Sequence, residues 1–197
     1  MRIASPNNRL FRAFGDWAIA RAMRTPYLHL FHDDGRPYME RYWLLRIGKS
    51  RSDDSGYTYP WFGIRIHHIV SSDDRVFHDH PWTFLTLLLR DGYTEITPMR
   101  LSYPAITLRT KFRAGSLRLV RASQWHFLEL DSGTSAWTLF ITFRKVQDWG
   151  FLVNGIKVPW RDYLAQRAAA KVNTYWDVGI SESIALRMPA KAEGSDV

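Results

Sequence analysis

Two histidines separated by one residue give this sequence its clearest chemical signal, because His78 and His80 flank Asp79. Side chains two positions apart on an extended strand face the same way, so both imidazoles can chelate one metal ion while Asp79 points away. His126 lies on a distant segment with the composition of a strand and can supply a third imidazole. Three neutral imidazoles that leave coordination positions open suit a divalent first-row metal such as Fe, Mn, Ni or Zn.

The other histidines carry weaker signals. His67 and His68 are neighbours on an expected strand, so they face opposite sides and one of them at most can reach an interior. There we expect a hydrogen-bonded core residue or a residue behind the ligands, not a ligand. His29 and His32 precede a DDG turn and are expected at the surface. The chain has no Cys, which excludes thiolate metal sites, disulfides and cysteine nucleophiles.

Short strands must position these side chains. Between residues 38 and 144, runs rich in Ile, Val, Thr and aromatic residues alternate with turn clusters such as DDSG, SSDD, RDG and DSGTS. About eight antiparallel strands in ~105 residues predict an all-β fold, a double-sheet jelly roll or small barrel. The expected strands cover 42–47, 61–70, 82–90, 93–97, 105–109, 116–121, 125–130 and 137–144.

One helix is expected on either side of the barrel. Apolar residues at helical spacing predict a helix over 7–24 that packs on the barrel; membrane contact through its basic face is the less favoured interpretation. An Ala-rich run after Pro159 predicts a second helix over 160–172, followed by a frayed tail of ~20 residues. We therefore expect an N-terminal helical extension (1–36), the barrel (37–150) and a C-terminal helix and tail (151–197). The apolar stripe of the first helix comprises Leu10, Phe11, Phe14, Trp17, Ala18 and Met23.

Composition bounds the partners. The net charge is +8, from 27 Lys and Arg against 19 Asp and Glu, but the basic residues form no run, so a nucleic-acid partner is not favoured. Hydrophobic residues make up 46% of the chain, which suits a folded domain with a small-molecule ligand better than a disordered segment. No apolar leader or membrane-length run occurs, so we expect no membrane contact and a cytoplasmic protein.

Two spaced patterns surround the histidines. In the first, Ser72 is followed after five residues by His78 and His80, then after four by Leu85 and after six by Gly92. In the second, Gly115 precedes His126 with Arg121 and Ser123 between them, and Leu130 follows His126 after three residues.

With these spacings the sequence resembles the cupin superfamily, whose two motifs have Gly at 72, 92, 115 and 123, Pro at 121 and Asn at 130. The wider pattern, HDHPW, RDGYTE, AGSLRLVRASQWH, AWTLFITFRK, DWGF and VPWRDYL, resembles uncharacterised cupin-like proteins of bacteria and their phages over roughly 40–165. The resemblance implies a cupin-type double-stranded β-helix with metal ligands at His78, His80 and His126, and it implies no established activity.

One departure from the cupin pattern affects the metal site. Cupins with a three-His, one-Glu site have Glu where this sequence has Leu85, and neither Leu85 nor Phe84 can ligate. The site is then either a three-His centre, as in thiol dioxygenases, or one in which Glu95 substitutes as fourth ligand or acid/base group. Glu95 could equally face solvent on its strand.

Other catalytic patterns fit less well. A two-His, one-carboxylate triad of the 2-oxoglutarate oxygenase type needs His-x-Asp, and Asp79 is adjacent to both His78 and His80. No GxSxG elbow is present for serine hydrolase chemistry.

These observations leave hypotheses of different classes open. The first is a mononuclear-metal oxygenase or isomerase that acts on a small molecule in a pocket lined by Trp82, Phe84 and Trp125, with Phe140 as a further candidate. An arginine of the pocket would anchor a carboxylate, and the candidates are Arg65, Arg90 and Arg118. The second is a non-catalytic, ligand-binding or phage-associated cupin module without metal. The third is a nucleic-acid or phage-assembly partner with a basic surface, and any of these could pair as a homodimer through its sheets.

Overall fold

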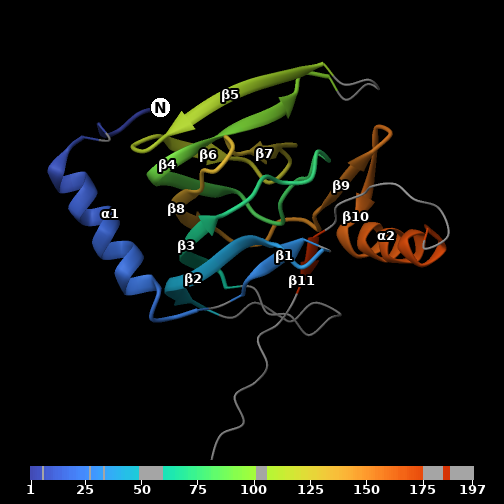
Figure 1. Cartoon of the computed structure of the whole chain (residues 1–197), viewed down its shortest axis with the longest axis horizontal. Helices are drawn as coiled ribbons and strands as arrows, with labels where there is room; N and C mark the ends of the chain where they lie inside the picture. Colours follow the sequence, from blue (N-terminus) through green and yellow to red (C-terminus); the bar gives the residue numbers. More distant parts are fainter. Residues whose placement is uncertain are drawn as a thin grey trace, which may run out of the picture.

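A computed structural model describes residues 1–174 and 184–186, apart from Pro6, Tyr27, Asp33, 49–59 and 101–105. The described part is mostly antiparallel sheet, with one helix at either side of it in the view of Figure 1. The elements are α1 (Arg9–Ala22), β1 (Leu30–His32), β2 (Pro37–Ile47), β3 (Phe62–Ile69), β4 (Phe84–Pro98), β5 (Thr107–Arg113), β6 (Leu117–Val120), β7 (Phe127–Glu129), β8 (Ala136–Thr142), β9 (Gly150–Val153), β10 (Ile156–Pro159), α2 (Trp160–Thr174) and β11 (Ile184–Leu186).

The strands build the jelly-roll barrel that the sequence predicts. They follow the order β11-β1-β2-β3-β8-β4-β5, and every pair is antiparallel. The first half of β4 also pairs with β6 and its second half with β7, so this one strand belongs to both parts of the barrel. Buried and half-buried residues alternate strictly along β8, so one face of this strand lines the interior of the barrel and the other faces outwards. The expected all-β fold is confirmed.

The expected division into strands 82–90 and 93–97 is wrong, because β4 runs without a break through the Arg90-Asp91-Gly92 segment. The register against β8 shifts between Leu88 and Arg90, and Asp91 has a φ of 56°. A β-bulge therefore absorbs the turn-like residues as a bend within the strand instead of a reversal. The bend is what lets β4 pass from one half of the barrel to the other.

Helix α1 packs on the barrel as expected, but only part of the expected apolar stripe faces it. Ala18 is buried and Phe11 packs against the same cluster, together with Ile19 and further small residues, and this cluster includes Tyr42 of β2, Ile66 of β3 and two leucines of β4. Leu10 and Trp17, which the helical spacing placed on the packed face, are 82% and 61% exposed. Small side chains let the helix approach the sheet closely, and the larger ones are left outside. The small buried residues are Gly15, Ala18 and Ala22.

The chain closes the barrel with a hairpin and a helix. β9 pairs with β10, α2 begins directly after Pro159, and Phe151 of the hairpin stacks on Tyr163 of the helix with ring centroids 4.1 Å apart. Part of the expected frayed tail forms β11, which pairs with β1, whereas the residues after it lie outside the described part. Among the described residues, neither helix has the length and apolar character needed to span a membrane.

The bend in β4 generates a stability prediction. A Cβ on Gly92 would lie 2.1 Å from the carbonyl oxygen of Phe112 on β5, so Gly92→Ala should lower the free energy of unfolding by about 1–3 kcal/mol. The matched variant Gly15→Ala makes only ordinary contacts, with the Leu89 Cβ at 3.6 Å and the Leu89 carbonyl oxygen at 3.7 Å, and gains helix propensity, so it should raise the same quantity by up to about 1 kcal/mol. Urea denaturation measures both, and equal stabilities for the two variants would contradict the close approach of β4 and β5.

Candidate metal centre

Backbone pairing holds the His78-Asp79-His80 segment in an extended conformation. The His78 N–H donates to the His126 carbonyl at 3.0 Å, and the His126 N–H donates back to the His78 carbonyl at 3.1 Å. The next residues are held from both sides, because Asp79 N–H donates to Gly150 O (3.1 Å) and His80 N–H to Ala122 O (3.0 Å). The expected strand is wrong in detail, since His78 sits in an isolated bridge. The alternation of side chains that a strand would give is nevertheless present.

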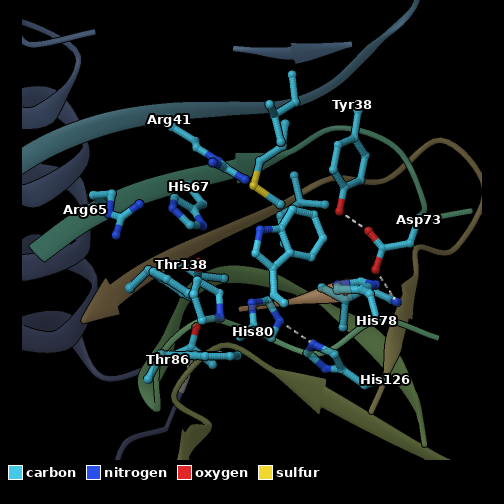
Figure 2. Close-up of a pocket in the computed structure, with 18 of the residues that line it drawn as sticks. Tyr38, Arg41, Arg65, His67, Asp73, His78, His80, Thr86, His126 and Thr138 are labelled. Atoms are coloured by element: carbon cyan, nitrogen blue, oxygen red, sulfur yellow. Dashed lines mark hydrogen bonds between the residues drawn. The ribbon is translucent and has the colours of Figure 1, made fainter. Parts of the chain in front are cut away.

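The three expected imidazoles converge. One ring nitrogen from each of His78, His80 and His126 lies within 4.8 Å of the other two. The Nε2 atoms of His80 and His126 face each other at 2.8 Å, as the dashed line in Figure 2 shows. His126 is 4% exposed and the other two are half-buried, so the cluster lies inside the barrel.

The protonation states of His78 and His80 suit metal binding. Burial lowers the pKa of His78 to about 3, helped by the nearby charge of His126. Burial also lowers the pKa of His80 well below its usual range, with further contributions from His126 and His78. Both imidazoles are therefore neutral at physiological pH and present lone pairs, which is the state that divalent first-row metals require. The donor set fits such an ion.

Asp79 anchors the segment from the side opposite the two imidazoles. Its buried carboxylate accepts hydrogen bonds from the Gly150 N–H (2.7 Å), the Gln147 side chain (2.9 Å) and the Lys157 ammonium (2.5 Å). As the alternation predicts, Asp79 points away from the cluster, and it ties His78 and His80 to the β9–β10 hairpin. No local pattern predicts Gln147 and Lys157 as its partners, because both are distant along the chain.

Glu95 supports the cluster from behind His126. It is 2% exposed, accepts a hydrogen bond from His126 Nδ1 at 2.6 Å and pairs with the guanidinium of Arg118. Burial raises the pKa of Glu95, but the hydrogen bonds and charges of His126 and Arg118 outweigh burial and hold it below its usual value. Glu95 thus neither faces solvent nor belongs to the converging nitrogens. It fixes the His126 tautomer so that Nε2 points at the other imidazoles.

On β4, the aromatic Phe84 and not the motif-position residue Leu85 faces the histidines. Leu85 is half-buried on the outer face of β4, whereas its neighbour Phe84 points inwards and is 3% exposed. The Phe84 ring lies edge-on to His80, with centroids 4.7 Å apart. The histidine cluster therefore has an apolar wall on this side.

The cluster opens onto a cavity of about 270 Å³ inside the barrel. Of the residues expected in a substrate pocket, Trp82, Phe84 and Phe140 line this cavity. Trp125 does not; it lies outside the lining, with the Lys157 ammonium 5.8 Å from its ring centroid. Sequence reasoning missed Trp149, Phe151, Trp160 and Leu164, which reach the cavity from the hairpin and α2 because those elements fold back over the barrel.

The remaining histidines separate as their positions on the strands dictate. His67 faces the cavity, stacks on Phe140 with centroids 4.4 Å apart, and its buried Nε2 has no hydrogen-bond partner. His68 points outwards, stacks on Trp137 and bonds to Glu40 at 2.9 Å. The alternation is confirmed, and the expectation of a hydrogen-bonded core histidine fails at Nε2 of the inward-facing residue, His67.

His32 and Arg90 lie elsewhere than the sequence predicts. His32 is 3% exposed and bonds to Ser71 at 2.6 Å, so its expected surface position is wrong, while His29 is half-buried. Arg65 lines the cavity. Arg90 lies on the surface and pairs with Asp16 at 2.6 Å, so it cannot anchor a ligand in the cavity.

An acidic group occupies the far wall of the cavity. Asp73 is buried, bonds to the Tyr38 hydroxyl and accepts a hydrogen bond from the Leu128 N–H at 2.6 Å. Burial raises the pKa of Asp73 to about 8; the Leu128 N–H opposes this shift and the charge of Asp74 adds to it. The carboxyl is therefore mostly protonated at neutral pH.

Comparison with known proteins supplies only structural neighbours. No protein-family model and no curated protein match the sequence. Among solved structures, the Fe(II) form of HppE is similar, with 13% identity, a TM-score of 0.42 and coverage of 59% of this chain and 56% of that chain. The polyketide cyclase RemF from Streptomyces resistomycificus has 12% identity, a TM-score of 0.39 and coverage of 55% and 71%. A protein with a double-stranded β-helix domain from Klebsiella pneumoniae has 10% identity, a TM-score of 0.40 and coverage of 59% and 85%.

The chain spans little more than half the length of HppE, and at these identities the likenesses say nothing about chemistry. The strand order and the enclosed interior themselves define the class: a cupin-type double-stranded β-helix with helices at both ends. Its interior contains a cluster of three histidines.

The role of Glu95 can be tested by its stability effect. Glu95→Gln removes the charge that compensates the Arg118 guanidinium, so the free energy of unfolding should fall by about 3–5 kcal/mol, the usual cost of breaking a buried pair. Glu129→Gln is the matched control, because Glu129 pairs with the exposed Arg109 and Arg75, and it should cost less than about 1 kcal/mol. If urea denaturation gave the two variants the same small loss, Glu95 would not be the anchor described above.

Asp73 generates a pH-dependent prediction. Its folded-state pKa of about 8 lies above the ordinary value of 3.8, so folding takes up a proton between these pH values and the stability of the protein falls as pH rises through them. Asp73→Asn cannot ionise and lacks this loss. Urea denaturation from about pH 5 to about pH 8 should show the variant gaining on the wild type, with a slope of up to about 1.4 kcal/mol per pH unit. Parallel curves would contradict a protonated Asp73.

Proposed function

We propose that His78, His80 and His126 hold one divalent metal ion and that the adjoining cavity is the active site of a mononuclear-metal enzyme acting on a small molecule. The observation that carries the proposal is the convergence of three ring nitrogens within 4.8 Å of one another at the wall of the cavity. Three imidazoles packed together in a buried site contribute little to the stability of the fold by themselves. A shared ion gives all three lone pairs a partner.

The donor set restricts the metal to a class. Imidazole nitrogens without thiolate or carboxylate suit Fe, Mn, Ni and Zn, and we propose an ion of this group. When bound, it would supply either activation of O2 or polarisation of a substrate carbonyl, the chemistry of an oxygenase or an isomerase. The supporting residues do the rest: Glu95 orients His126, and Asp79 keeps His78 and His80 on one side of the segment.

The side chains that line the cavity would surround a bound substrate. Trp82, Phe84 and Phe140 pack into one cluster beside the histidines and exclude water from the reacting end of a ligand. Asp73 holds a proton on its carboxyl within the same cavity, hydrogen-bonded to Tyr38, where it can be given to a bound ligand. Glu95 does not line the cavity, so we assign it the orientation of His126 and not acid or base catalysis.

The metal is testable directly. Protein purified without a chelator or a histidine tag should contain about one equivalent of a first-row metal by elemental analysis, and His80→Ala should lose it. The matched control is His68→Ala, whose imidazole points outwards and should leave the metal content unchanged. Chelation should destabilise the wild type by about 4 kcal/mol if the free metal stands at roughly a thousand times its Kd, and should leave His80→Ala unaffected.

Wild-type protein without metal would remove the enzyme proposal, as would equal loss from His80→Ala and His68→Ala. Ligand-induced stabilisation that ignores chelators would then favour a non-catalytic binding module instead.

A further inference from the structure

A second group of polar side chains faces the cavity from the wall formed by β2 and β3. Arg65 and His67 are two positions apart on β3, so both point inwards, and Arg41 of β2 is the direct cross-strand partner of His67. Figure 2 shows these three side chains gathered on one side of the cavity, apart from Tyr38 and Asp73 on the other. None of them belongs to the three-histidine cluster.

Packing fixes the orientation of the Arg65 side chain. Arg65 is 2% exposed, and its guanidinium lies over the rings of Trp43 (4.7 Å) and Trp82 (5.1 Å) while donating to Thr142 Oγ1 at 3.0 Å. A guanidinium held between two indole rings keeps its charge in a place of low dielectric, where an anion is attracted more strongly than in water.

His67 provides an unused hydrogen-bonding atom at the same place. The residue is 5% exposed, its ring is stacked on Phe140, and its Nε2 is buried without a partner. Burial lowers the pKa of His67 well below its usual range, and the charges of Arg41 and Arg65 lower it further. The cross-strand position of Arg41 and the position of Arg65 two residues away on the same face of β3 place both cations beside this ring. A buried polar atom left without a partner in a cavity is expected to meet a ligand or water.

The rest of the cavity gives these cations little acidic competition. Asp73 is the one carboxyl among the described residues that line the cavity, and its raised pKa keeps it mostly neutral. Apolar side chains, among them Ile69, Phe140 and Met39, form much of the remaining wall. A ligand that matches these surroundings has an acid group at one end and an apolar body.

We propose that Arg41, Arg65 and His67 form a subsite for the acid group of the substrate, which is a small, mainly apolar organic anion. The acid group lies against the β2–β3 wall, and the opposite end of the molecule reaches the three histidines. The reacting end rests on the proposed metal function, whereas the anion subsite does not. A cavity of about 270 Å³ is of a size that suits a small organic molecule.

A pair of isosteric probes tests the subsite. Butyrate and its neutral analogue butyramide are titrated against the protein while thermal stabilisation is followed, both in zinc-loaded protein and after removal of metal. Butyrate should bind at least tenfold more tightly than butyramide in both forms, because the guanidiniums attract only the charged ligand. Measuring the metal-free protein separates this subsite from direct coordination of the carboxylate by a metal ion.

Variants assign the effect to residues. Arg41→Gln and His67→Phe, which keeps an aromatic ring beside Phe140, should each weaken butyrate binding at least tenfold and leave zinc content unchanged. Arg46→Gln removes a cation from the exposed end of the same strand and should leave butyrate affinity unchanged. Arg65→Lys keeps the charge but loses the planar fork, so it tests whether the fork itself contributes to butyrate binding.

The outcomes separate the two proposals. Equal affinities for butyrate and butyramide, or the same loss in Arg46→Gln as in Arg41→Gln, would overturn the anion subsite. Butyrate binding that disappears on removal of metal, and persists in Arg41→Gln and His67→Phe, would also overturn it while leaving the metal proposal intact. Selective butyrate binding in a protein that never takes up metal would support the subsite and overturn the metal centre.

Discussion

The reciprocal backbone pair between His78 and His126 is the contact on which the interior depends. It joins two segments that are far apart in the chain and carry all three clustered imidazoles, and each residue both donates and accepts one hydrogen bond. Because His78 is fixed against His126, the extended backbone places the His80 side chain on the same side. The alternation then sends Asp79 in the opposite direction, to the hairpin that closes the cavity. A local pairing thus sets the position of the cluster and of the cover above it.

Two buried carboxylates keep this arrangement in place without entering the cluster. Asp79 is compensated by Lys157 and Glu95 by Arg118, so each negative charge has a cation outside the circle of imidazoles. Such pairs add little net stability, because desolvation of both charges offsets their attraction, but they penalise any displacement that would separate them. Their effect is therefore on geometry: Glu95 selects the nitrogen that His126 offers, and Asp79 selects the side on which His78 and His80 lie.

Several of these features could be read from the sequence, and the reasons for the failures are physical. The two-residue period of an extended chain was enough to place His78, His80 and Asp79, and to separate His67 from His68. The role of Glu95 was out of reach, since it depends on β4 continuing through the bulge at Arg90 and pairing with β7, which no local pattern reveals. Residue type was also a poor guide to the cavity wall. Trp125 was predicted to line the pocket because of its indole ring, but this ring lies outside the cavity. The packed face of α1 depends on small residues, which hydrophobic spacing does not count.

The apolar side chains of Phe84 and Leu85 add no negative charge to the site, and the β2–β3 wall adds positive charge. In the proposed function, an ion held by three neutral imidazoles keeps its full double charge, because the cluster of converging nitrogens includes no carboxylate. Arg41 and Arg65 line the same cavity, and its one described carboxyl, on Asp73, is held mostly protonated. Positive charge in a place of low dielectric is costly unless an anion joins it. An anionic substrate in the proposed subsite would bring its negative charge close to these cations and to the proposed ion, and this electrostatic match is what joins the two proposals.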